Sequence, residues 1–161
     1  MNSALEDTIY CAPGRIFCKI RKILVGVDGS EGAARATTVA FEIGELTKSK
    51  VHIVYIVPLP NIKHISVMSD VSEEELLQKY QVNGKRILQG YEDASGDYDI
   101  QVETLLDKGL PSDMLIALAD ELGIDLIVLG SHGGTAVMKS GMGSSTERVV
   151  LGASCPVFVV K

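Results

Sequence analysis

The 161-residue sequence has no tryptophan and few other aromatic residues, with three phenylalanines and five tyrosines. Hydrophobic residues still make up 46% of the chain, and most of them are valine, isoleucine, leucine and alanine. Branched aliphatic side chains of this kind suit a parallel β-sheet that helices cover on both faces. At this length we expect one domain with a sizeable core.

The sequence also has no excess of positive charge, no long apolar run and no basic segment at its start. Its formal net charge of −6 argues against a general nucleic-acid surface, which needs a basic face. No apolar run approaches the ~20 residues that a membrane span requires. The first seven residues carry acidic side chains where a signal peptide would be basic. We therefore expect a cytoplasmic protein that binds neither nucleic acid nor membranes.

Cysteine is scarce, and one well-known nucleotide motif is missing. Cys11, Cys18 and Cys155 are an odd number without regular spacing, which does not indicate a disulfide framework. Cys11 and Cys18 are too far apart for a CxxC metal or redox motif. The chain has no GxxxxGK[ST] sequence, so P-loop chemistry is not indicated.

The most informative segment that is present runs from residue 125 to residue 152. The apolar residues 125–129 predict a buried strand, and residues 146–152 predict a helix. Between them lie Gly-Ser-His-Gly at 130–133 and, after nine residues, Gly-Ser-Ser-Thr at 143–146. Glycine lets the backbone approach a ligand closely, and the first amides of a helix favour an anion. The segment predicts a phosphate site; a loop whose glycines only turn the chain is the alternative.

Strand-like and helix-like patterns alternate along the whole chain. We expect strands at residues 22–27, 51–57, 100–106, 125–129 and 156–160. This order predicts a single-domain α/β fold, a doubly wound, Rossmann-like sheet of five parallel strands. Residues 1–20 are expected to form an N-terminal tail or arm, and residues 21–161 the nucleotide-binding domain.

Local signals refine the expected elements. Ser30 is a suitable N-cap for the helix after the first strand, which should bury a face made of Ala36, Val39, Ala40, Ile43 and Leu46. Residues 59–71 indicate a long connection. Ser144 stands three residues before Glu147, which is the spacing of a capping box, so Ser144 is expected both to cap its helix and to bind a ligand.

Ligands of doubly wound sheets bind beyond the carboxyl ends of the strands, where the strand order reverses. If the first and fourth strands are neighbours, residues 27–30 (Val-Asp-Gly-Ser) face the glycine loop. The alternative is that Asp28 and Gly29 only form the turn that starts a helix. His132, between two glycines of the loop, is interpreted as a solvated loop residue.

Four motifs together resemble the universal stress protein family. They are Gly-Val-Asp-Gly-Ser at 26–30, Leu-Ile-Val-Leu-Gly-Ser-His-Gly at 126–133, the Gly-x2-Gly-x9-Gly-Ser loop, and Cys-Pro-Val-Phe-Val-Val at 155–160. The resemblance covers about residues 21–161 and is closest to the branch whose members bind ATP through that loop. It implies an adenine nucleotide α-hydrolase-like fold, with ATP as the ligand and AMP or ADP as alternatives.

The resemblance also implies roles for individual residues. The strand end at Val27, Asp28, Gly29 and Ser30 would border adenine and ribose, with Asp28 near a hydroxyl or a bound Mg or Mn ion. Ile53 or Val54 would form an apolar wall for the base, and Leu129 and Gly130 would pack beside the nucleoside. The phosphates would lie on the loop residues Gly133, Gly143, Ser144, Ser145 and Thr146. Residues 157–160 would join two chains in a homodimer.

Efficient ATP hydrolysis needs a positioned water, a base and a charge clamp on the γ-phosphate. The sequence offers one aspartate beside a glycine loop and no second carboxylate or lysine in a recognisable place, so we assign no catalytic residue. Nucleotide binding with little or no turnover, in a stress-response or regulatory protein, is the first hypothesis. A slow ATP hydrolase or nucleotidyl-transferring enzyme of the same superfamily is the second, and a scaffold without ligand is the third.

Overall fold

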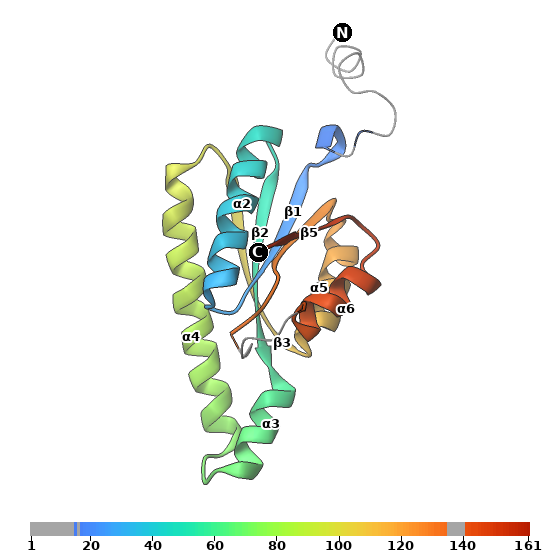
Figure 1. Ribbon diagram of the computed structural model, residues 1–161. Helices are drawn as coiled ribbons and strands as arrows, with labels where there is room; N and C mark the ends of the chain where they lie inside the picture. Colours follow the sequence, from blue (N-terminus) through green and yellow to red (C-terminus); the bar gives the residue numbers. More distant parts are fainter. Residues whose placement is uncertain (1–14, 16, 135–140) are drawn as a thin grey trace.

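The computed structural model describes residues 15, 17–134 and 141–161, and within them five parallel strands form one sheet (Figure 1). The strands are β1 (Lys22–Val27), β2 (Lys50–Pro58), β3 (Gln101–Gly109), β4 (Leu126–Gly130) and β5 (Val157–Val160), in the spatial order β3-β2-β1-β4-β5. The α-helices are α2 (Glu31–Thr47), α3 (Leu59–Met68), α4 (Glu73–Ala94), α5 (Pro111–Leu122) and α6 (Ser144–Gly152), and short 3₁₀ turns are η1 (Phe17–Lys19) and η2 (Ser95–Asp97). The predicted doubly wound α/β fold is confirmed.

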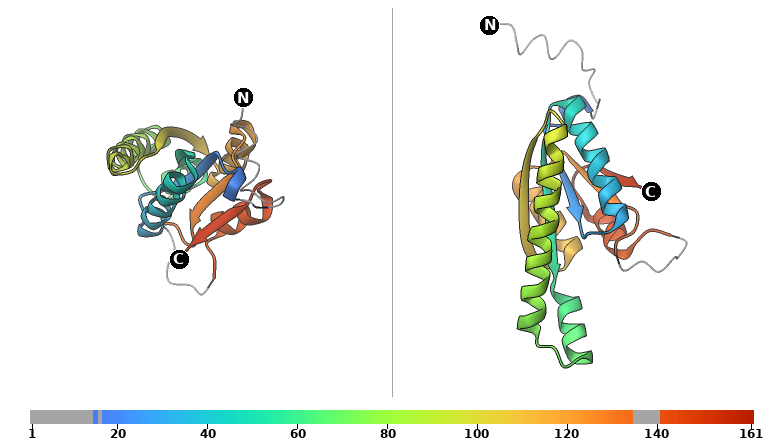
Figure 2. Two further views of the ribbon diagram at one scale, coloured as in Figure 1. Left: turned by 90° about the horizontal axis from the view of Figure 1, so that it is seen from above. Right: turned by 90° about the vertical axis from the view of Figure 1, so that its left-hand side faces the viewer.

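Helices cover both faces of the sheet, as the view from above and the side view both show (Figure 2). Successive side chains of a strand point to opposite faces, so β2 contributes side chains to two hydrophobic clusters, one on each face of the sheet. Ile53 and Tyr55 pack with α2 and α4, whereas Val54 and Ile56 pack with α5 and with Val149 of α6. None of the helices in the described ranges is both long and apolar enough to cross a membrane.

The strand order reverses beside β1. β1 pairs with β2 on one side and with β4 on the other, so β1 and β4 are the neighbours that the prediction required. β1 ends at Val27 opposite Tyr55, but β2 and β3 stay paired as far as Pro58 and Gly109. The last three residues of β2 therefore extend about 10 Å past the end of β1, at roughly 3.3 Å per residue.

Two local expectations were wrong. Residues 59–71 do not form a plain connection, because α3 occupies most of them. A proline in the first turn of α3 suits a helix start, and Ile62 of this helix is buried against the core. Leu46 is 84% exposed, since the buried face of α2 is centred elsewhere. That face consists of Ala33, Ala36, Thr37, Ala40, Phe41 and Gly44. Leu46 lies two residues past Gly44, about 200° further round the helix.

The segment just before β1 packs against the domain. Ile20, which the prediction placed at the end of a tail, is buried in the core, and its carbonyl accepts a hydrogen bond from Ser49 Oγ at 3.0 Å. Cys18 in η1 is disulfide-bonded, although the odd cysteine count did not indicate a disulfide framework; Cys155 is a free thiol. Expectations for residues 1–14 and 16 lie outside the described residues.

Two glycines of α4 allow a matched test of the packing between α4 and the sheet. A Cβ on Gly84 would lie 2.5 Å from Cδ1 of Tyr55, whereas a Cβ on Gly90 would meet nothing within 4 Å. We predict that Gly84→Ala lowers the free energy of unfolding by about 1–3 kcal/mol through overpacking. Gly90→Ala should raise it by about 0.5–1 kcal/mol, because alanine favours a helix more than glycine does. Urea unfolding followed by circular dichroism measures both, and equal stability of the two variants would contradict the close contact.

Candidate functional site

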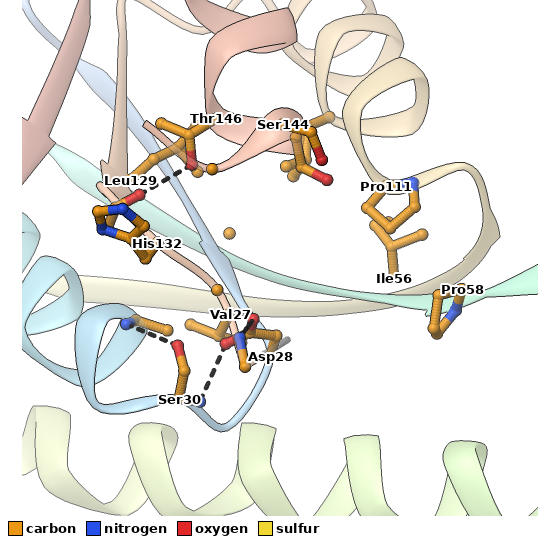
Figure 3. Close-up of a pocket in the computed structure, with 18 of the residues that line it drawn as sticks. Val27, Asp28, Ser30, Ile56, Pro58, Pro111, Leu129, His132, Ser144 and Thr146 are labelled. Atoms are coloured by element: carbon orange, nitrogen blue, oxygen red, sulfur yellow. Dashed lines mark hydrogen bonds between the residues drawn. The ribbon is translucent and has the colours of Figure 1, made fainter. Parts of the chain in front are cut away.

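A pocket of about 700 Å³ opens at the carboxyl edge of the sheet, where β1 and β4 separate (Figure 3). This volume is typical of small-molecule sites, and its position is the one at which doubly wound sheets bind ligands. Most residues predicted for the site line this pocket. They are Val27, Asp28, Ser30, Val54, Leu129, Gly130, Gly133, Gly143, Ser144, Ser145 and Thr146.

Gly29 and Ile53 were also predicted for the site, but the structure places them outside the pocket lining. Gly29 forms the turn after β1 with φ of +82°, and a Cβ there would lie 2.9 Å from Cδ1 of Ile87, so this residue faces α4. Ile53 is fully buried in the core between the sheet and α2 and α4. Because Ile53 and Val54 point to opposite faces of β2, only Val54 reaches the pocket.

The carboxylate of Asp28 connects the two loops that form the pocket walls. Its Oδ1 accepts a hydrogen bond from the Ser30 amide at 2.9 Å, and its Oδ2 accepts one from the Gly134 amide at 2.8 Å. A Cβ on Gly133 would lie 2.7 Å from Oδ2, so the carboxylate needs a glycine at that position. The hydrogen bonds of Asp28 therefore connect the turn after β1 to the glycine loop after β4.

The first turn of α2 packs directly on the backbone at the end of β4. A Cβ on Gly130 would lie 2.7 Å from the carbonyl carbon of Gly32, and a Cβ on Gly32 would lie 2.7 Å from the carbonyl oxygen of His132. Ser30 caps α2 as predicted, since its Oγ accepts a hydrogen bond from the Ala33 amide at 3.1 Å. Glycine at both contact positions allows this backbone-to-backbone approach.

The amino end of α6 forms the opposite wall of the pocket. The helix starts two residues earlier than predicted: Gly143 is its N-cap, and no side chain caps it. The capping role expected of Ser144 is therefore wrong, because Ser144 is the first residue inside the helix and not the residue before it. Thr146 uses its hydroxyl to donate to the Gly130 carbonyl at 2.9 Å, which fixes α6 against β4. Within residues 17–134 and 141–161, no side chain accepts a hydrogen bond from the first amides of α6.

The described part of the pocket lining contains one carboxylate, that of Asp28, and neither lysine nor arginine. His132 lines the pocket and is half-buried; its Nδ1 lies 3.0 Å from Ser131 Oγ. An anion here would be held by amides and hydroxyls, without cationic side chains from the described lining. In the described part of the chain no three His, Cys, Asp or Glu side chains are close enough to form a metal site of their own.

Sequence reasoning missed the part of the lining that lies beyond the end of β1. Asn61 of α3, Tyr80 of α4 and Pro111 of α5 belong to it. No motif marks these residues, and the region of Asn61 was interpreted as a connection. Their place in the pocket depends on how α3, α4 and α5 pack.

Comparison with known proteins identifies the family. The model described as the universal stress protein family matches residues 19–161. The chain belongs to the universal stress protein family. It is 32% identical over 143 residues to the putative universal stress protein SH1215 of Staphylococcus haemolyticus, and the match covers 88% of this chain and 84% of the relative.

Solved structures of universal stress proteins share the fold. The protein UspA from Lactobacillus plantarum superposes with a TM-score of 0.77 at 26% sequence identity, covering 88% of this chain and 97% of that one. A universal stress protein solved in complex with cAMP gives a TM-score of 0.66 at 24% identity, covering 88% of this chain and 96% of that one. At that identity the second likeness shows the fold alone.

Asp28 offers a test of the connection between the two loops. We predict that Asp28→Ala, without added nucleotide, lowers the free energy of unfolding by about 1 kcal/mol, because two amides lose a charged acceptor. Asp97→Ala in η2 removes the same charge at an exposed position, where the carboxylate has no hydrogen-bond or ion-pair partner among the described residues, and serves as the control. Chemical unfolding of both variants measures the difference. Equal stability would mean that Asp28 does not hold the loops together.

Proposed function

We propose that this protein binds an adenine nucleotide, with ATP as the expected ligand and AMP or ADP as alternatives. The phosphates would lie between the glycine loop and the amino end of α6, and the nucleoside would cross the end of β1 between Val54 and Leu129. The observation that carries this proposal is the uncapped amino end of α6, which borders a pocket whose nearest loop is built from glycines. Free helix amides and the helix dipole together favour a phosphate.

We further propose that binding proceeds with little or no turnover. The one carboxylate among the described lining residues already accepts hydrogen bonds from two amides, which makes it a poor candidate for a general base. The described lining offers no cationic clamp for a γ-phosphate, although phosphoryl transfer depends on such a clamp. In this proposal the protein is a cytoplasmic, regulatory stress-response protein whose state depends on nucleotide occupancy.

A divalent cation fits the chemistry of the pocket when it comes with the phosphates. Mg²⁺ and Mn²⁺ prefer oxygen ligands, and Mg²⁺ commonly takes one or two carboxylates together with substrate phosphates. Each Asp28 oxygen accepts one hydrogen bond and keeps acceptor capacity, so the carboxylate would hold the ion. The ion would offset the repulsion between Asp28 and a polyphosphate.

The test of nucleotide binding uses extraction and one glycine variant. Acid extraction of the purified protein should release adenine nucleotide, and calorimetry should show ATP binding. A Cβ on Gly143 would lie 3.3 Å from the Ser131 carbonyl oxygen, so the larger Gly143→Val should distort the wall of the pocket and weaken ATP binding at least tenfold. Gly96→Val, at an open position in η2, is the control. Undiminished affinity in Gly143→Val would contradict the phosphate site, and incubation with labelled ATP would reveal any hydrolysis.

We also propose a homodimer through β5, which is an edge strand in the described part of the sheet. Phe158 on β5 is 41% exposed, and the nearby α6 exposes Leu151. The Pro156 carbonyl accepts a hydrogen bond from Ile127 of β4, and the Val160 carbonyl accepts one from Ser131, the residue after β4. The polar backbone groups of Val157 and Val159 therefore point to the free edge. An open apolar edge favours pairing with a second chain.

Val159→Pro tests the dimer. It removes a backbone donor at the free edge and leaves the hydrogen bonds to β4 in place. We predict that light scattering shows a dimer for the wild type and a shift toward monomer for the variant. A wild type that stays monomeric at high micromolar concentration would rule the dimer out.

A further inference from the structure

A buried histidine lies toward the amino end of the sheet, away from the pocket. His52 is the third residue of β2, and its side chain is 4% exposed. Like Val54 two residues later, it points to the face of the sheet that α5 covers (Figure 1). Its register partners are Leu24 on β1 and Glu103 on β3. Neither ring nitrogen has a hydrogen-bond partner among the residues that the structure describes, and a buried polar group without a partner costs the folded state free energy.

Charged side chains approach His52 from β1, β2 and β3. Glu103 Oε2 lies 3.8 Å from His52 Nδ1, and the same oxygen accepts a hydrogen bond from Lys50 Nζ. Lys22 of β1 adds a second positive charge, and its Nζ donates to the Leu122 carbonyl at 2.8 Å. The carboxylate nearest to the ring is therefore already paired with a lysine.

α5 covers this face of the sheet with apolar side chains. Leu118 and Leu122 are partly buried and pack in the same hydrophobic cluster as the residues of β1 and β2 on this face. The acidic residues at this end of α5, Asp120 and Glu121, are exposed. A proton on the imidazole would thus place a positive charge beneath an apolar cover, next to a carboxylate that Lys50 already holds.

We propose that His52 is an acid-sensitive switch in the fold. The ring is neutral in the folded protein near neutral pH, and its protonation in mild acid destabilises the packing of α5 on this end of the sheet. The proposal is independent of nucleotide binding. It assigns a role to a buried histidine that takes no part in the pocket.

The direction of the pH dependence follows from the surroundings of the ring. Burial lowers the pKa of His52 below its ordinary value; the charge of Glu103 opposes this shift, and Lys50 and Lys22 add to it. In the unfolded chain the ring titrates at its ordinary pKa of about 6.5. Between that value and the lower pKa of the folded state, the unfolded chain binds more protons. The contribution of His52 to stability is therefore complete above pH ~7 and is lost as the pH falls through this interval.

Urea unfolding of the full chain between about pH 5 and about pH 8 tests the switch. The wild-type equilibrium constant for unfolding should rise as the pH falls below about 6.5, by at most about tenfold per pH unit for one proton. His52→Gln cannot take up this proton, so the ratio of the wild-type constant to its own should rise by roughly threefold or more over the range. His64→Gln removes an exposed histidine of α3 and, as the matched control, should keep the wild-type profile.

Proton NMR of the wild type follows the same ring without a substitution at His52, and it decides the question even if His52→Gln does not fold. The His52 ring should titrate at a lower pH than the exposed His64 ring. Glu103→Gln should move the His52 titration to a still lower pH, because it removes the negative charge that favours the imidazolium. Identical pH profiles for the wild type and His52→Gln, or a His52 ring that titrates at or above the pH of His64, would overturn the proposal.

Discussion

The close contact between the first turn of α2 and the end of β4 determines the geometry of the site. Gly32 and Gly130 have no Cβ, and a Cβ on Gly130 would lie 2.7 Å from the Gly32 backbone. With the two segments this close, the carboxylate of Asp28 reaches the Gly134 amide at 2.8 Å. The turn after β1 and the loop after β4 are thereby held as the two walls of one pocket. A side chain at either glycine would separate these walls.

This arrangement brings two helix amino ends to the same edge of the sheet, but they differ in what they leave free. The amino end of α2 is satisfied by the protein, since Ser30 caps it and Asp28 accepts the Ser30 amide. The amino end of α6 has Gly143 as its N-cap, and no side chain of the described residues accepts its first amides. A buried or ligand-facing helix end needs partners for its amides. Of the two helix ends, the amino end of α6 is consequently the one whose amides are left for a ligand.

The sequence predicted those features that depend on short-range patterns. Apolar runs located the strands, and the motifs at residues 26–30 and 126–133 located both walls of the pocket. Features that depend on contacts between distant residues were missed. Leu46 follows the helical period of its neighbours, but the sheet packs against a face centred on Ala36 and Ala40. The choice between Ile53 and Val54 required the orientation of β2, which an all-apolar strand does not reveal.

The part of the pocket that lies beyond the end of β1 illustrates the same limit. β1 stops at Val27 because the Asp28–Gly29 turn follows, while β2 and β3 continue to Pro58 and Gly109. Unequal strand lengths thus create space at the end of the sheet, and α3 places Asn61 beside that space. The wall beside the amino end of α6 consists of glycines and hydroxyl side chains, whose close contacts restrict what can replace them. The wall beyond the end of β1 consists of larger side chains such as Asn61, Tyr80 and Pro111, which can change without disturbing the glycine contacts. These two parts of the pocket can therefore vary independently of each other.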